Sequence, residues 1–293
     1  MAEKLEEKDW GLLLERIKDG ECTPFLGAGA CYGVLPLGAK LALEWAEKHS
    51  YPLKDSCKDL ARVAQYLAVE YDPMFPKGEI VKKFREMGTP NFDDPDEPHS
   101  VLAELPLPVY ITTNYDDFMF QALKKKNKDP GRNFCRWNTY VKDIEKPTRI
   151  SVPTIAKPLV FHLHGIIEER RSIVLTEDDY LDYLISISKD PKLIPPRIQE
   201  AFTGTSLLFL GYGLADWDFR VLFRSIVSYL QKSIAMSHVS VQLIPGEVID
   251  SDKAQQYLNN YFKELKIKVY WGTCRQFVAE LKRRWQEYTN VKH

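Results

Sequence analysis

The most constraining feature of the sequence is a short apolar run, Thr23–Leu26, that ends in two glycines separated by one alanine, Gly27-Ala28-Gly29. The run is too short for a helix, so it predicts a buried strand that breaks into a tight turn, with a helix following near Leu37–Glu47. Glycines at such a turn let the backbone approach a ligand, and amides beyond the strand can face a pyrophosphate. The same turn also occurs in ordinary strand-to-helix connections, so by itself it favours a nucleotide site only weakly.

Apolar strand patterns recur along the chain and alternate with helical patterns. The expected strands are Pro108–Thr112, Leu159–His164, Ser206–Leu210, His238–Ile244 and Ile267–Tyr270. Apolar residues at helical spacing predict helices at Glu6–Asp19, Trp217–Leu230, Ala254–Leu265 and Gln276–Glu287. Alternating strands and helices are typical of a parallel sheet with helices on both faces. The sequence therefore predicts an α/β fold with a Rossmann-like, doubly wound, mostly parallel sheet.

One long segment of the chain carries helical patterns and no convincing strand. It runs from about residue 58 to residue 105 and includes the apolar groups of Leu60–Leu67 and Ile80–Phe84. The stretch Gly88–Pro98 is rich in proline, aspartate and glycine, which predicts a loop. We therefore expect a single domain over residues 1–293, with a helical lobe inserted at about residues 50–105.

The composition excludes several classes of protein. A hydrophobic content of 44% and a charged content of 28% are typical of a globular protein, and a formal net charge of −1 favours neither nucleic acid nor an anionic membrane as a direct partner. Residues 1–8 are too charged for a signal peptide, and no apolar run is long enough to span a bilayer. Five scattered cysteines without a Cys-x-x-Cys pair argue against a disulfide framework and a thiolate zinc site. We expect a cytoplasmic protein without a metal.

Polar residues follow the predicted strands at the points where ligands bind in a doubly wound sheet. Beyond the glycine turn, these residues are Asn114 and Asp116, then His164 before Gly165, then Gly211-Tyr212-Gly213 with Asp216. Together they supply backbone amides, a carboxamide, carboxylates and an imidazole.

Each of these side chains also has a structural interpretation. Asn114, Asp116 and Asp216 could cap the helices that follow them. His162 and His164 lie two apart and share one face of a strand, and burial in the core is the favoured interpretation for His162. The lysine-rich stretch Lys124–Lys128 is more typical of a solvated loop than of a nucleic-acid contact.

Taken in order, these motifs resemble the sirtuin-like family. Gly27-Ala28-Gly29 comes first, Thr112-Thr113-Asn114-Tyr115-Asp116 is similar to the sirtuin Thr-Gln-Asn-Ile-Asp signature, and His164-Gly165 resembles the catalytic His-Gly. Gly211-Tyr212-Gly213-Leu214 occupies the place of the sirtuin Gly-Thr-Ser-Leu after a strand. The ordered set is more specific than any one motif.

The departures from the sirtuin pattern narrow the resemblance. Protein-deacylating sirtuins carry a zinc ribbon of two Cys-x-x-Cys pairs, whereas Ile166–Thr203 contains no cysteine. The chain resembles instead the zinc-less, sirtuin-like effectors of bacterial antiphage defence. That resemblance implies cleavage of NAD, as substrate and without a metal, leading to NAD depletion. It also implies a homo-oligomer and a separately encoded partner, for which a hexameric HerA-type ATPase is the leading expectation.

The resemblance also implies roles for the residues. Asn114 and His164 would be catalytic: Asn114 would bind the ribose or orient water, and His164, with a pKa of roughly 6.5, would act as a base. The predicted cofactor-binding residues are Gly27, Ala28, Gly29, Asp116, Gly211, Gly213 and Asp216.

Two other functions remain open from the sequence. The first is a transferase of the same fold, which either ADP-ribosylates a protein or deacylates lysine, although the missing zinc ribbon counts against deacylation. The second is a non-catalytic module that binds NAD or ADP-ribose as a sensor, or that serves as a scaffold for an ATPase.

Overall fold

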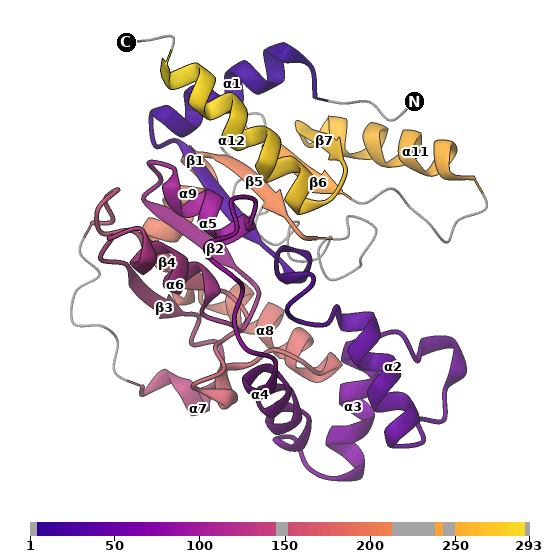
Figure 1. Cartoon of the computed structure of the whole chain (residues 1–293). Coiled ribbons are helices and arrows are strands. Elements are labelled where there is room, and N and C mark those ends of the chain that lie inside the picture. The colour runs from indigo at the N-terminus through magenta and orange to yellow at the C-terminus, as the bar shows by residue number, and fades with distance from the viewer. Residues whose placement is uncertain (1–4, 145–151, 213–237, 243–249, 291–293) are drawn as a thin grey trace.

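The computed structural model of the chain describes residues 5–144, 152–212, 238–242 and 250–290. Within these ranges the strands form one seven-stranded sheet in which all neighbouring strands are parallel, in the order β3-β4-β2-β1-β5-β6-β7 (Figure 1). The strands are β1 Cys22–Leu26, β2 Val109–Thr112, β3 Gly131–Phe134, β4 Leu159–His162, β5 Ser206–Leu210, β6 His238–Gln242 and β7 Ile267–Trp271. The predicted α/β fold with a parallel sheet is confirmed.

Strand β1 lies at the point where the direction of the sheet reverses. It pairs with β2 on one side, where Leu26 lies opposite Thr112, and with β5 on the other, where Leu26 lies opposite Leu210. Without the edge strand β3, the remaining six strands follow the doubly wound order 3-2-1-4-5-6. Ligands in such sheets bind beyond the carboxyl ends of the strands at this reversal, which here is the end of β1.

Strand β3 was not predicted from the sequence. It is an edge strand that pairs with β4, and its residues are Gly131, Arg132, Asn133 and Phe134. Only the last two are buried. A short polar strand of this kind is defined by its hydrogen bonds to a neighbour and has no apolar run that a pattern could detect.

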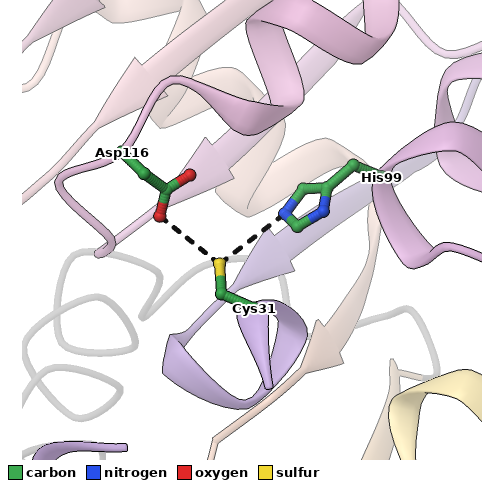
Figure 2. Close-up of side chains that lie close together, drawn as sticks. All are labelled: Cys31, His99 and Asp116. Atoms are coloured by element: carbon green, nitrogen blue, oxygen red, sulfur yellow. Dashed lines mark hydrogen bonds between the residues drawn. The ribbon is translucent and has the colours of Figure 1, made fainter. Parts of the chain in front are cut away.

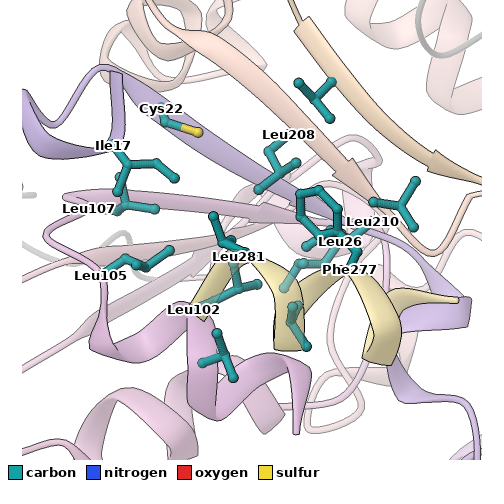
Figure 3. Packing of buried hydrophobic residues seen from close by; sticks show 14 of the residues in the cluster. Ile17, Cys22, Leu26, Leu102, Leu105, Leu107, Leu208, Leu210, Phe277 and Leu281 are labelled. Carbon is teal, nitrogen blue, oxygen red and sulfur yellow. The ribbon is translucent and has the colours of Figure 1, made fainter. Parts of the chain in front are cut away.

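Helices cover both faces of the sheet, as predicted. One face packs against α1 Glu7–Lys18, α5 Pro98–Glu104, α6 Phe118–Lys125 and α12 Cys274–Asn290. Figure 3 shows part of this core, where Leu26, Leu208 and Leu210 of the sheet meet Phe277 and Leu281 of α12. The other face packs against α8 Glu177–Lys189, α9 Pro196–Gly204 and α11 Ser251–Glu264. Alternate residues of a strand face opposite sides, so Phe209 joins the second core while Leu208 and Leu210 join the first.

A group of three helices lies apart from these two layers. It consists of α2 Gly38–Lys48, α3 Leu60–Glu70 and α4 Phe75–Met87, which share a separate apolar core (Figure 1). That core also includes Tyr115, which follows β2, so the three helices lie against the carboxyl end of the sheet. Helix α5 belongs to the sheet's own core instead. The division into one domain with an insertion at about residues 50–105 stays a prediction.

The predicted helix Trp217–Leu230 lies outside the described residues, as do the last two residues of the predicted strand His238–Ile244. In the part of the chain that the structure describes, none of the helices combines the length and the hydrophobicity that a membrane crossing requires.

Candidate functional site

The glycine turn at the end of β1 packs directly against the turn at the end of β5. The amide of Gly27 donates to the carbonyl of Leu210 at 2.8 Å, and the amide of Gly29 donates to the carbonyl of Gly211 at 2.9 Å. A Cβ atom on Gly29 would lie 2.8 Å from Cα of Gly211, closer than real Cβ atoms come to other atoms. The glycines are therefore required for the contact between two backbones.

This packing changes the role expected of the turn. The amides of Gly27, Gly29 and Ala30 already donate to carbonyls of the chain, the last to the carbonyl of Gly27 at 3.0 Å. The expectation that the amides of Gly27 and Gly29 face a pyrophosphate is therefore not met in this arrangement, because each has a partner in the chain. A contact between Ala28, which is exposed, and a ligand stays a prediction.

Asn114 lies two residues beyond β2, and its side chain points back to the glycine turn. Its Nδ2 donates to the carbonyl of Gly27 at 3.1 Å and lies 3.2 Å from Sγ of Cys31. Its amide donates to Oγ1 of Thr112 at 2.9 Å. Asn114 does not cap helix α6, which begins at Phe118 after Asp117. Its side chain instead links the ends of β1 and β2.

The backbone of Asn114 is held by a histidine of the next strand. Nδ1 of His162 donates to the carbonyl of Asn114 at 3.0 Å. His162 is 1% exposed, and burial lowers the pKa of its imidazole to about 4. Its predicted burial is confirmed, but the contact with Asn114 could not be seen in the sequence.

His164 lies two residues beyond the end of β4, and Asn114 lies two residues beyond the end of β2. The last residues of these strands, Thr112 and His162, are paired, so Asn114 and His164 extend from the same level of the sheet. The ring of His164 packs edge-on against Tyr180 and Tyr183, with centroids 5.4 and 5.0 Å away. Gly165 has φ +91°, and a Cβ there would lie 2.2 Å from the carbonyl oxygen of Ser172. Any other residue after His164 would therefore clash with Ser172, which explains the glycine at position 165.

The expected pKa of His164 was wrong. The side chain is 5% exposed, and burial lowers its pKa to about 3, well below the value of roughly 6.5 for a free imidazole. The cause is desolvation of the charged form in an aromatic environment. At neutral pH the imidazole is therefore neutral and available as a hydrogen-bond acceptor.

Asp116 belongs to a buried group of side chains that the sequence did not reveal (Figure 2). Sγ of Cys31 lies 3.4 Å from Oδ2 of Asp116 and 3.9 Å from Nε2 of His99. Nδ1 of His99 in turn lies 2.6 Å from Oε1 of Glu97. Burial raises the pKa of the Asp116 carboxyl and, together with the nearby Asp116 charge, raises that of the Cys31 thiol. The other carboxylate oxygen of Asp116 accepts the amide of Phe118 at 3.0 Å, so Asp116 also supports the start of α6.

Tyr212 lies in the predicted Gly211-Tyr212-Gly213 turn, but the role of its side chain could not be seen in the sequence. Its hydroxyl donates to the carbonyl of Leu26 at 2.8 Å and lies 2.8 Å from Oγ1 of Thr113. It thereby joins the carboxyl ends of β1, β2 and β5. Of the other predicted residues, Gly211 has φ +81° and packs against Ala30, whereas Gly213 and Asp216 lie outside the described residues.

Comparison with known proteins identifies the family to which this sheet and its polar strand ends belong. The model of the SIR2-like domain family matches residues 108–269, which include β2, β4, β5 and the residues Asn114 and His164. Among curated relatives, NAD(+) hydrolase ThsA of Enterococcus faecium is 28% identical over 213 residues, which cover 69% of this chain and 39% of the relative. NAD(+) hydrolase ThsA of Bacillus cereus (strain MSX-D12) is 30% identical over 125 residues, or 42% of this chain and 23% of the relative.

Defense-associated sirtuin 2 of Bacillus subtilis is 26% identical over 230 residues, which cover 75% of this chain and 20% of the relative. The chain thus spans between a fifth and two fifths of the length of these three relatives. The family match covers more than half of the chain and includes the central strands of the sheet. The chain belongs to the SIR2-like domain family.

Proposed function

We propose that this protein is an NAD glycohydrolase, which cleaves NAD to nicotinamide and ADP-ribose. The observation that carries the proposal is the placement of Asn114 and His164 beyond paired ends of neighbouring strands, with the side chain of Asn114 bonded to the glycine turn of β1. This is the reversal point of the sheet, where doubly wound folds bind ligands. The relatives named NAD(+) hydrolase support the choice of NAD as substrate.

The protein does not have to activate the leaving group in this reaction. Nicotinamide in NAD carries a positive charge and leaves as a neutral molecule, so the reaction needs no general acid. The site has to hold the ribose, stabilise an oxocarbenium-like C1′ and supply water. Nδ2 of Asn114 is held by the carbonyl of Gly27, so we assign its Oδ1 to a ribose hydroxyl or to the attacking water.

His164 acts in this proposal as a neutral acceptor. Its lowered pKa makes it a weak base, so it acts by accepting a hydrogen bond that orients the water or ribose hydroxyl, and the proton passes to solvent after the new C1′–O bond forms. An oxocarbenium-like carbon reacts with weakly activated water. Positioning alone has a large effect, because a misplacement of about 1 Å can cost about 10²-fold in rate.

The same proposal places the protein in bacterial antiphage defence, acting in the cytoplasm by depletion of NAD. The name of the relative Defense-associated sirtuin 2 supports the defence role. A homo-oligomer that works with a separately encoded, hexameric HerA-type ATPase is the assembly that we propose on the basis of the sequence resemblance.

The test is incubation of purified protein with NAD, alone and with the product of the adjacent gene, followed by mass spectrometry. We expect nicotinamide and ADP-ribose, and a loss of at least about 100-fold in rate for Asn114→Ala and His164→Ala. Asn260→Ala on the exposed side of α11 and His49→Ala in the helical lobe are the matched controls. Wild-type rates in both site variants would show that the site assignment is wrong. Formation of acetyl-ADP-ribose or of a modified protein would show that the reaction is a transfer and not a hydrolysis.

A further inference from the structure

The buried group Cys31, His99 and Asp116 has the composition and spacing of a metal site (Figure 2). Its three donor atoms come from separate segments: the turn after β1, the first turn of α5 and the loop after β2. The atoms lie within 4.8 Å of one another, with Sγ 3.4 Å from the carboxylate and 3.9 Å from the imidazole. Around a tetrahedral Zn²⁺ with bonds of about 2.0–2.3 Å, donor atoms lie about 3.3–3.7 Å apart. The distance of 3.4 Å between the thiol and the carboxylate falls in this range, and the distance of 3.9 Å between the thiol and the imidazole lies about 0.2 Å beyond it.

A second observation points the same way. Nδ1 of His99 donates to Oε1 of Glu97 at 2.6 Å, so Nε2 is the ring nitrogen that faces Cys31 and Asp116. Glu97 is itself fixed by the amides of His99 and Ser100, at 3.1 and 2.6 Å. A carboxylate that orients the far side of a histidine is the usual outer partner of a metal-bound imidazole. Glu97 therefore fixes the orientation of the His99 ring in which Nε2 can bind a metal ion.

The charges of the group are also those that a divalent cation would balance. Asp116 is 6% exposed, and the charged groups that act on it are His99 and Asp117, neither of which is a lysine or an arginine. The three ligands, as a thiolate, a carboxylate and a neutral imidazole, balance a divalent cation, and the carboxylate of Glu97 behind His99 leaves the group with one net negative charge. Without a cation the buried carboxylates and a thiolate would carry three negative charges, and a buried site tolerates unbalanced charge poorly. Binding would release the thiol proton to solvent.

We propose that Cys31, His99 and Asp116 bind a borderline transition-metal ion, with Zn²⁺ as the best match, and that the bound ion inhibits NAD cleavage. The donor set of sulfur, nitrogen and carboxylate oxygen favours Zn²⁺ over Mg²⁺ or Ca²⁺, which prefer oxygen ligands. The inhibitory part rests on the proposed function. Nδ2 of Asn114 lies 3.2 Å from Sγ of Cys31, and a metal-bound thiolate holds that donor more strongly than a thiol does. The stronger contact draws the carboxamide from the carbonyl of Gly27 toward Cys31, which moves Oδ1 of Asn114 away from the position that the proposed function assigns to it.

The binding test uses Co²⁺, which reports tetrahedral thiolate coordination by its absorption spectrum. The full chain is stripped with a chelator and titrated with Co²⁺. We expect one ion per chain with a thiolate charge-transfer band, displaced by Zn²⁺. Cys31→Ser should remove the band, and Glu97→Gln should weaken binding about 10–100-fold. Thermal melts of each variant establish that it is folded.

The matched controls are Cys57→Ser and Cys274→Ser, which change the two less buried cysteines and should leave the Co²⁺ spectrum unchanged. The proposal is overturned if the chain binds no stoichiometric Co²⁺, or if the thiolate charge-transfer band persists in Cys31→Ser. In either case Cys31, His99 and Asp116 form a hydrogen-bonded group and not a metal site.

The inhibition test measures NAD cleavage with and without Zn²⁺ in wild type and Glu97→Gln. We expect one equivalent of Zn²⁺ to suppress the wild-type rate at least about tenfold, with the inhibition curve of Glu97→Gln shifted about 10–100-fold to higher Zn²⁺. If the rates of NAD cleavage are equal with and without bound Zn²⁺, the inhibitory part of the proposal is wrong, and the metal site itself is unaffected by that result. If the chelated protein cleaves no NAD with or without its partner, the proposed function fails, and the Co²⁺ spectrum still decides the metal site.

Discussion

Nδ1 of His162 donates to the backbone carbonyl of Asn114 at 3.0 Å, so a buried side chain of β4 holds the candidate catalytic residue that follows β2. The other ring nitrogen, Nε2, is buried without a hydrogen-bond partner. An unpaired buried nitrogen costs free energy, and the ring is therefore poorly explained by stability alone. The contact fixes the backbone from which the Asn114 carboxamide projects.

This relationship predicts a separation between stability and turnover. His162→Leu removes the donor to Asn114 together with the unpaired nitrogen, so the free energy of unfolding should change little. Loss of the contact with the Asn114 carbonyl should instead misplace the carboxamide and lower kcat by up to about 100-fold, with little change in KM. His162→Asn, which keeps a donor near the position of Nδ1, should recover most of kcat. Steady-state kinetics of the three proteins provide the measurement, and equal kcat values would show that the contact has no role in positioning.

The buried imidazole of His164 predicts the pH dependence of NAD cleavage. A lowered pKa means that the neutral form persists as the pH falls, and protonation sets in only toward pH 3. The rings of Tyr180 and Tyr183 that face it are uncharged in this range. We therefore expect kcat to change less than about twofold between pH 6 and pH 8, whereas a base with a pKa of roughly 6.5 would lose about half its activity at pH 6.5. A midpoint near pH 6.5 that disappears in His164→Asn would contradict the burial of this ring.

Two glycine-to-alanine changes should have opposite effects on stability. Gly29→Ala would place a Cβ 2.8 Å from Cα of Gly211, which forces the two turns apart and should cost on the order of 2 kcal/mol of unfolding free energy. Gly11→Ala, in helix α1 with no atom within 4 Å of the new Cβ, should add about 0.5–1 kcal/mol. Urea denaturation of both variants measures the difference. If Gly29→Ala is as stable as wild type, the turns are not packed as closely as described.

A buried ion pair connects the helical group α2–α4 to helix α8. Nζ of Lys77 lies 2.7 Å from Oδ1 of Asp179, and the two side chains are 7% and 13% exposed. Lys77→Met would leave the carboxylate buried without its cation and should cost about 3 kcal/mol of unfolding free energy. The control is Arg283→Met, which breaks the exposed pair with Glu287 and should cost less than about 1 kcal/mol. Chemical denaturation that gave the same cost for both variants would refute the distinction.

The sequence predicted most of the fold because the central strands are apolar runs. Six of the seven strands were placed, and so were the helices at the two ends of the described chain, α1 and α12. The edge strand β3 was missed, since its residues Gly131–Phe134 are largely polar and its pairing with β4 is decided by backbone hydrogen bonds. Helix α5 was grouped with the inserted lobe because a helical pattern does not reveal which core its apolar face joins.

The candidate site was predicted in its positions and only partly in its contacts. Asn114 follows a predicted strand and His164 was predicted to end one, two residues beyond the observed end of β4, so their placement at one edge of the sheet could be predicted. The participation of Tyr212 and His162 was not, because each acts through a backbone carbonyl of a segment far away in sequence. The group of Cys31, His99 and Asp116 was not predicted for the same reason, because Cys31 lies 68 residues from His99 and 85 residues from Asp116 in the sequence.

The sequence by itself determined the alternation of strands and helices and the polar residues that end each strand, because local hydrophobic patterns and glycine turns encode both. Only the tertiary structure decided which of those residues meet and in what state of ionisation. The placement of β1 between β2 and β5 brings the turn at Gly29 against Gly211, and burial among aromatic rings lowers the pKa of His164 to about 3. Proximity and desolvation depend on the packing of distant segments, and no local pattern records them.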